Sequence, residues 1–255
     1  MSTVPTAQDV ADRARTVLVV SVVATLALYL VPAGWYLSYP LLLISTVFHE
    51  LGHGFGAWLS GGEFDEFNMF SDASGYAVTR TSGDLSRAIV LMGGLVGPAV
   101  AAMVSFIAAR RARLARYCLG AIGAWLLLSE ILVVRSAFGL FFVGILGATC
   151  LAIAVRTSAQ TAQIALTFMA VQLALSVFSR SGYLFAKSAG RGLPSDVMQL
   201  SEVLAGPFWF WGVVCGVISL VCLIVGGWVL IRAGKTRTKQ RHGVSAAGTN
   251  RPSGF

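Results

Sequence analysis

The chain has 255 residues, of which 56% are hydrophobic and only 12% are charged, about half the ~25% of charged residues that is typical of soluble domains. Nineteen Lys and Arg with eleven Asp and Glu cannot cover a soluble surface of this size, which excludes a soluble enzyme, a disordered chain and a coiled coil. The net charge is +8, but the basic residues lie mostly between apolar segments and in the tail, where they set topology or contact anionic lipid rather than nucleic acid. The composition predicts a multi-pass integral protein of the cell membrane, with the lipid bilayer as a partner.

Apolar segments of about 20 residues, the length of a spanning helix, recur along the chain. We expect them at Val17 to Trp35, Tyr39 to Leu59, Ile89 to Ala109, Tyr117 to Val134, Ala137 to Val155, Gln160 to Phe178 and Leu204 to Ile231. Pro32 makes a poor signal-cleavage site, so the first segment is expected to be retained as a membrane anchor. These segments predict an all-α polytopic membrane helix bundle of six to seven transmembrane helices.

Two regions outside these segments have their own character. Phe67 to Phe70 and Tyr76 to Thr79 flank a polar turn, a pattern that predicts a short β-hairpin after the second apolar segment. The hairpin either closes two helices at the surface or offers a sheet edge to an unwound substrate segment. We expect residues 1–231 to form one membrane-embedded domain and residues 232–255 to form a basic, disordered tail.

Chemistry concentrates in His49-Glu50-Leu51-Gly52-His53, which holds two of the three histidines. Residues at i and i+4 share a helix face, so both imidazoles can bind one metal ion, and zinc suits such a donor set. Glu50 is positioned to deprotonate a metal-bound water and to pass the proton to the leaving amine. With these histidine and glutamate frequencies the pattern arises by chance roughly 0.0007 times in a chain of this length. Ionisable groups in a membrane are also costly unless they are functional. The alternative is a polar helix contact satisfied by neighbouring helices.

A catalytic zinc usually has three protein ligands, so a third is expected elsewhere. The candidates are Asp196, Glu130 and Asp72, and for Asp72 a turn-forming role is the better interpretation. Counting the membrane crossings returns Asp196 to the face where the HELGH helix ends, and it does not exclude Glu130. Pro and Gly near Asp196 allow non-helical backbone to line a cavity. We therefore expect Asp196 to complete a site with His49 and His53 for one Zn²⁺ per chain.

These residues resemble the site-2-protease-type intramembrane zinc metallopeptidases. The resemblance rests on the HELGH sequence, on the Gly-Pro segment from Gly93 to Pro98, and on a late aspartate. It implies that His49 and His53 are zinc ligands, that Glu50 is the general base, and that peptide bonds are hydrolysed within or beside the bilayer. Better-known members carry the third ligand in an Asp-Gly motif, whereas Pro194-Ser195-Asp196 resembles a variant of a bacterial subgroup.

We therefore expect a zinc endopeptidase that cuts membrane-associated protein substrates. The alternative is a non-proteolytic scaffold or metal-binding transporter with a relic HExxH motif. Two arguments conflict on orientation. By the crossing count, eleven of the nineteen basic residues lie on the side away from HELGH, so the positive-inside rule puts that side in the cytoplasm, whereas the family resemblance implies the reverse. The sequence does not indicate an oligomeric state.

Overall fold

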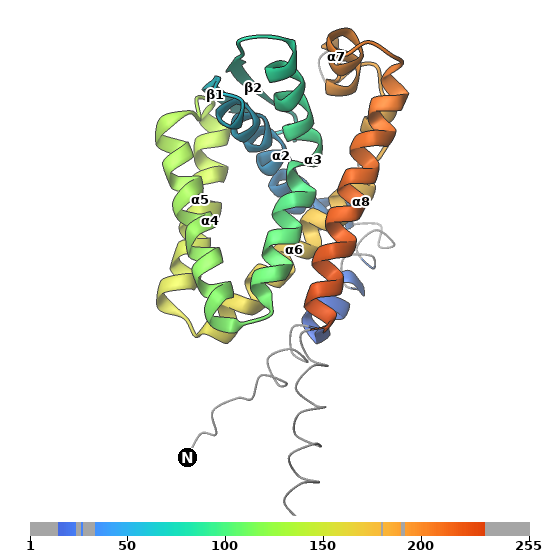
Figure 1. Cartoon of the computed structure of the whole chain (residues 1–255). Helices are drawn as coiled ribbons and strands as arrows, with labels where there is room; N and C mark the ends of the chain where they lie inside the picture. Colours follow the sequence, from blue (N-terminus) through green and yellow to red (C-terminus); the bar gives the residue numbers. More distant parts are fainter. Residues whose placement is uncertain (1–14, 24–26, 28–33, 180, 190–191, 233–255) are drawn as a thin grey trace, which may run out of the picture.

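The computed structural model describes residues 15–23, 27, 34–179, 181–189 and 192–232. A helical stretch at 15–23 precedes the named elements. These are α2 (Gly34–Leu59), β1 (Glu63–Met69), β2 (Gly75–Arg80), α3 (Asp84–Ala109), α4 (Ala112–Leu132), α5 (Ala137–Arg156), α6 (Ala159–Ser179), η1 (Ser181–Phe185), α7 (Asp196–Val203) and α8 (Phe208–Arg232). The predicted helix bundle with a β-hairpin after the second apolar segment is confirmed (Figure 1).

Within the described residues, five helices are long and apolar enough to cross a membrane: α3, α4, α5, the run Ala159–Phe185 that contains α6, and α8. The sequence predicts six to seven. Helix α2 has 26 residues, as many as α3, but it is not among the five because His49, Glu50 and His53 lower its hydropathy. The first expected segment, Val17 to Trp35, lies partly outside the described residues.

Helices α3 and α6 form the centre of the bundle. In their most apolar windows 56% of the residues are buried, against 28% for α4 and α5 and 22% for α8. The α4–α5 pair lies on one side of the centre and α8 on the other (Figure 1). The amide of Gln163 in α6 is buried and donates to the Ala109 carbonyl of α3 across 2.6 Å, so polar groups of the central helices bond to each other rather than facing lipid.

The hairpin is bonded to the bundle at its turn and along the outer edge of β1. At the turn, Tyr39 and Thr46 of α2 donate to the carbonyls of Ser71 and Ala73. β1 and β2 pair antiparallel, with a register shift between Phe64 and Glu66. On the other edge of β1, the N–H of Phe67 donates to the Val133 carbonyl at 2.7 Å, and the Phe67 carbonyl accepts from the N–H of Arg135 at 3.0 Å. Phe67 and Met69 are 0% exposed and pack against α2, α4 and α5. Within the part of the chain that the structure describes, β2 is therefore the free edge of a two-stranded sheet.

Two expectations need correction. The count of membrane crossings predicts that the basic residues before the first apolar segment lie at the HELGH end of the bundle. In the structure, Arg15 donates to the carbonyl of Ile231, at the opposite end. The last carbonyls of a helix lack intrahelical donors and attract cations, which explains why Arg15 lies at the end of α8. The last apolar segment was expected to begin at Leu204, but positive φ at Ala205 and Gly206 delays α8 to Phe208. The expected tail lies outside the described residues from 233 onward.

Candidate metal centre

The HELGH sequence lies in the second half of α2, where two imidazoles face the same point. His49 and His53 are one turn apart, their Nε2 atoms are separated by 3.3 Å, and their rings meet edge to face. Nδ1 of His53 lies 2.9 Å from the Val90 carbonyl of α3. A carbonyl can only accept, so Nδ1 carries a proton, which leaves Nε2 as the nitrogen that a metal ion would bind. The orienting partner is of the kind that metal-binding histidines have.

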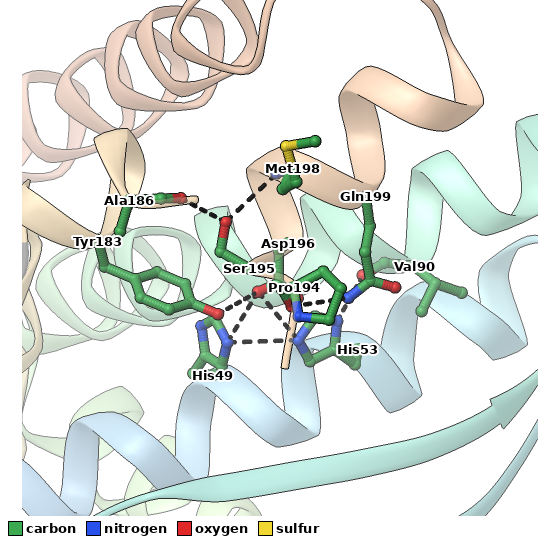
Figure 2. Close-up of polar contacts among 10 residues, drawn as sticks. All are labelled: His49, His53, Val90, Tyr183, Ala186, Pro194, Ser195, Asp196, Met198 and Gln199. Atoms are coloured by element: carbon green, nitrogen blue, oxygen red, sulfur yellow. Dashed lines mark hydrogen bonds and ion pairs between the residues drawn. The ribbon is translucent and has the colours of Figure 1, made fainter. Parts of the chain in front are cut away.

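Asp196 reaches the histidines because a short loop and a helix start place it there. Ser195 caps α7, since its hydroxyl accepts from Met198 N–H and donates to the Ala186 carbonyl. Asp196 is the first residue of α7 and is 7% exposed. Gln199 of the same helix accepts a hydrogen bond from Arg87 of α3. Helix α7 is therefore held at both its start and its side, and the aspartate points at α2 (Figure 2).

The three side chains form a compact triangle of donor atoms. Oδ2 of Asp196 lies 3.1 Å from Nε2 of His49 and 3.4 Å from Nε2 of His53. A tetrahedral zinc with bonds of about 2.0–2.1 Å separates its ligand atoms by roughly 3.3–3.4 Å, so the triangle has the right size for zinc. Burial opposes ionisation of Asp196, but His53 and His49 outweigh it and hold the pKa of this carboxyl below its ordinary value. An ionised carboxylate beside two imidazoles is a donor set that suits zinc.

Neighbouring groups fix this geometry. The hydroxyl of Tyr183 in η1 donates to Oδ2 of Asp196 across 3.3 Å, and its ring lies edge-on to His49 (Figure 2). A Cβ at Gly94 would come within 2.3 Å of Nε2 of His53, so only glycine leaves room for this imidazole against α3. At the neighbouring position, Gly93 meets Gly52 of α2 backbone to backbone. The Gly-Pro segment therefore packs directly behind the histidines, as its small residues indicate.

Glu50 lies between the cluster and the hairpin. Its side chain is 4% exposed, and a Cβ at Gly75, the first residue of β2, would come within 2.9 Å of its Oε1. His49 and Glu50 line two cavities. The first, of about 390 Å³, carries hydroxyl groups from three helices: Ser45, Thr46, Ser176 and Ser219. The second, of about 540 Å³, runs along β2 and also contains His53 and Asp196.

The other two candidates for a third ligand lie elsewhere. Glu130 of α4 packs against Gly144 of α5. Asp72 accepts from the backbone N–H and the hydroxyl of Ser74, which is the turn-forming role that its place in the hairpin indicates. Among the described residues, the one group of three or more metal-binding side chains that converge is His49, His53 and Asp196. The structure thus brings Asp196, and not Glu130, to the histidines.

A family model described as Peptidase M50B-like matches residues 19–226, which is most of the chain. The chain belongs to the site-2 protease family. Comparison with curated proteins and with solved structures gives no match. Membership in the M50 peptidases supports an intramembrane metallopeptidase, and these peptidases are zinc-dependent. The membership and the five apolar helices together indicate an integral membrane protein.

Sequence reasoning missed the residues that support the cluster. Tyr183 lies in a polar loop without a motif, and the Val90 carbonyl has no sequence signature at all. The signal that could have pointed to Tyr183 is topological, because the loop at 180–202 returns to the HELGH face. Gly75 next to Glu50 follows from the position of the hairpin, which the sequence does not specify. In this member of the site-2 protease family, the groups that contact the cluster and Glu50 come from α3, η1 and β2.

Proposed function

We propose that the chain is an intramembrane zinc endopeptidase that hydrolyses peptide bonds of membrane-associated protein substrates. His49, His53 and Asp196 would hold one zinc ion, and Glu50 would act as the general base. The observation that carries this proposal is the triangle of donor atoms, with sides of 3.1 to 3.4 Å, beside a buried glutamate at the junction of two cavities. Membership in the family supports the same reaction class.

The residues around the cluster would divide the work of proton transfer and positioning. Bound zinc supplies a Lewis acid and lowers the pKa of a water molecule towards ~7. The Glu50 carboxylate accepts the proton of the attacking water and delivers it to the amine of the leaving group. Tyr183 and the Val90 carbonyl hold Asp196 and His53 in place, and the hydroxyl-lined cavity gives water a polar route to Glu50.

The free edge of β2 supports strand addition as the mode of substrate binding. A transmembrane helix keeps its amides in internal hydrogen bonds, so a substrate segment must unwind before water can attack it. An extended segment would pair with β2, whose Gly75 contacts Glu50 and whose length lines the larger cavity. Main-chain pairing would hold many different sequences, while the side-chain pockets along the cavity would select among them.

The proposal is tested by separating metal binding from catalysis at Glu50. Detergent-purified wild type should contain about one zinc per chain, His49→Ala should lose it, and Glu50→Gln should keep it. In cells, the membrane proteins cut in the presence of the wild type should stay intact with Glu50→Gln. Glu130→Gln is the matched control, because it removes a second glutamate of the bundle that lies away from the cluster.

Two results would contradict the proposal. Wild type that binds no zinc even when zinc is supplied would exclude a zinc peptidase. A cellular effect that survives Glu50→Gln unchanged would favour the alternative of a scaffold or transporter with a relic motif.

A further inference from the structure

The larger cavity extends well beyond the candidate metal centre. Its volume of about 540 Å³ lies within the range of about 300–1,000 Å³ that is usual for ligand pockets. Besides the cluster and Glu50, its wall consists of residues from β2, α3, α7 and the segments next to them. The chemistry of this wall away from the cluster therefore decides which substrate side chains fit.

Two helices lead from the cluster to the far end of this cavity. On α3, Gly94 lies against the His53 ring, and Arg87 precedes it by two turns on the same face, a rise of roughly 10 Å. On α7, Gln199 follows Asp196 by one turn (Figure 2). The two helices are joined there, because Nη2 of Arg87 donates to Oε1 of Gln199 across 3.2 Å.

Strand β2 reaches the same end of the cavity. Gly75 contacts Glu50, and the wall continues along the strand to Thr79, a span of about 13 Å. The end of β2 and the start of α3 both lie at the end of α2. Two contacts fix this common level, namely Gly62 with the carbonyl of Arg80 and the hydroxyl of Ser60 with that of Ser86 at 2.8 Å.

Arg87 brings a positive charge to this far end. Among the described residues it is the one Lys or Arg that lines either cavity. It is exposed, and none of the described carboxylates forms an ion pair with it, whereas Arg80 is paired with Glu63 and Asp65. A guanidinium has five N–H donors in a rigid fork, and Gln199 accepts from one of them. The remaining donors are left for an acidic group in the cavity.

Glu202 is the competing charge at this end. It lies one turn beyond Gln199 on α7, lines the same cavity and is exposed. The planar fork of Arg87 is already held by Gln199, so it loses less freedom on pairing than an unheld side chain does. This difference favours an acidic over a basic substrate side chain.

We propose that Arg87 is a specificity-determining residue, which binds an acidic side chain of the substrate about four residues from the one opposite Gly75. The inference rests on the proposed function and on strand addition to β2. Val90 and Leu91 line the cavity between the cluster and Arg87, so the intervening substrate positions take apolar side chains. An exposed ion pair of this kind selects for an acid by about 2- to 5-fold.

Peptide capture by a protein without the base tests this binding apart from hydrolysis. Detergent-purified, zinc-loaded Glu50→Gln is mixed with a library of synthetic peptides of varied sequence, and mass spectrometry identifies the peptides retained. Asp and Glu should be enriched about 2- to 5-fold among them. Cleavage of the same library by the wild type should place the enriched acid about four residues from the cut bond.

Three further variants, each combined with Glu50→Gln, identify the residue responsible. Arg87→Gln keeps a donor for Gln199 but loses the charge, so the enrichment of acids should disappear while zinc content stays normal. Arg87→Glu should enrich Lys and Arg instead. Lys187→Glu is the matched control, because it makes the same change of charge at an exposed position outside both cavities, and it should retain acidic peptides.

Enrichment of acids that is absent from Glu50→Gln, or that persists in Arg87→Gln, would overturn the proposal. Enrichment of Lys and Arg with Arg87 intact would assign the selectivity to Glu202 and overturn it as well. In each case, cleavage of the library by the wild type would leave the proposed function standing. Capture that depends on Arg87, without any cleavage by the zinc-loaded wild type, would instead support the binding site and contradict the peptidase assignment.

Discussion

The hydroxyl of Tyr183 donates to Oδ2 of Asp196, the same oxygen that faces both histidines. Tyr183 thus links the 3₁₀ helix η1 to the carboxylate that α7 presents. Partners of this kind orient a metal-binding side chain, and their loss typically costs about 10–100-fold in metal affinity or activity.

Tyr183→Phe should therefore lower zinc affinity by about 10–100-fold while the ring stays against His49. Competition with a chromogenic chelator measures the affinity. Tyr117→Phe, which removes the hydroxyl of an exposed tyrosine in α4, is the control and should bind zinc as the wild type does. Equal affinity in Tyr183→Phe and wild type would show that the hydroxyl has no part in holding Asp196.

Asp196→Asn should abolish stoichiometric zinc binding, because an amide lacks the charge that a carboxylate contributes beside two imidazoles. Glu130→Gln should leave zinc content unchanged. Elemental analysis of both purified variants beside the wild type decides between the two acids. Loss of zinc in Glu130→Gln alone would reverse the assignment.

Gly94→Ala should displace His53, since the new Cβ would lie within 2.3 Å of Nε2. Overpacking of this kind costs about 1–3 kcal/mol, and zinc content should fall with it. Gly227→Ala in α8 is the matched control, because a Cβ there has no neighbour within 4 Å among the described residues. Zinc content and thermal unfolding of the two variants should differ clearly, and the prediction is wrong if they behave alike.

Gly75→Ala should separate the base from the ligands. Its Cβ would approach Oε1 of Glu50 to 2.9 Å, which moves the carboxylate but leaves the histidines untouched. Zinc content should stay normal while substrate cleavage in cells falls, towards the loss of about 10²–10⁴ that removal of a general base causes. Gly83→Ala, which meets no described atom within 4 Å, should cleave normally.

The metal-free protein should show the charge of Asp196 in its pH dependence. The folded pKa of this carboxyl lies below its ordinary value, so its stabilising contribution is present above the ordinary aspartate pKa of about 3.9 and is lost as pH falls through the folded value. With a chelator present, the difference in Tm between wild type and Asp196→Asn should shrink as the buffer is taken below about pH 4. A difference that grows below that pH would contradict this sign.

Local patterns in the sequence predict the ligands on α2 and the hairpin, because each depends on residues close together in the chain. The i, i+4 spacing of His49 and His53 determines their shared face. Asp196 is nearly 150 positions further on. Counting the membrane crossings returns it to the HELGH end without excluding Glu130, and the Pro and Gly near Asp196 favour it. The count works because the sequence correctly predicts four membrane helices, α3 to α6, between HELGH and Asp196, and an even number of crossings returns the chain to the same side.

The remaining features depend on contacts that no local pattern encodes. Gln163 dilutes an apolar segment and weakens its prediction as a membrane helix, yet it lies in the centre of the bundle because Ala109 accepts its hydrogen bond. The position of Arg15 likewise depends on where α8 ends. Tyr183 and Val90 join the site through tertiary packing alone.

The bonds that join β1 to the α4–α5 connection have a further consequence. Ser136 both accepts from Met69 N–H and donates to the Met69 carbonyl, at 2.8 Å each, so the hairpin cannot slide along its own axis without breaking these bonds. Residues along a strand are spaced by about 3.3 Å, and an added strand on β2 would inherit a fixed offset from Glu50. The helix pair α4–α5, which holds none of the three proposed ligands, would then fix the register of a bound substrate strand and so determine which of its peptide bonds lies at Glu50.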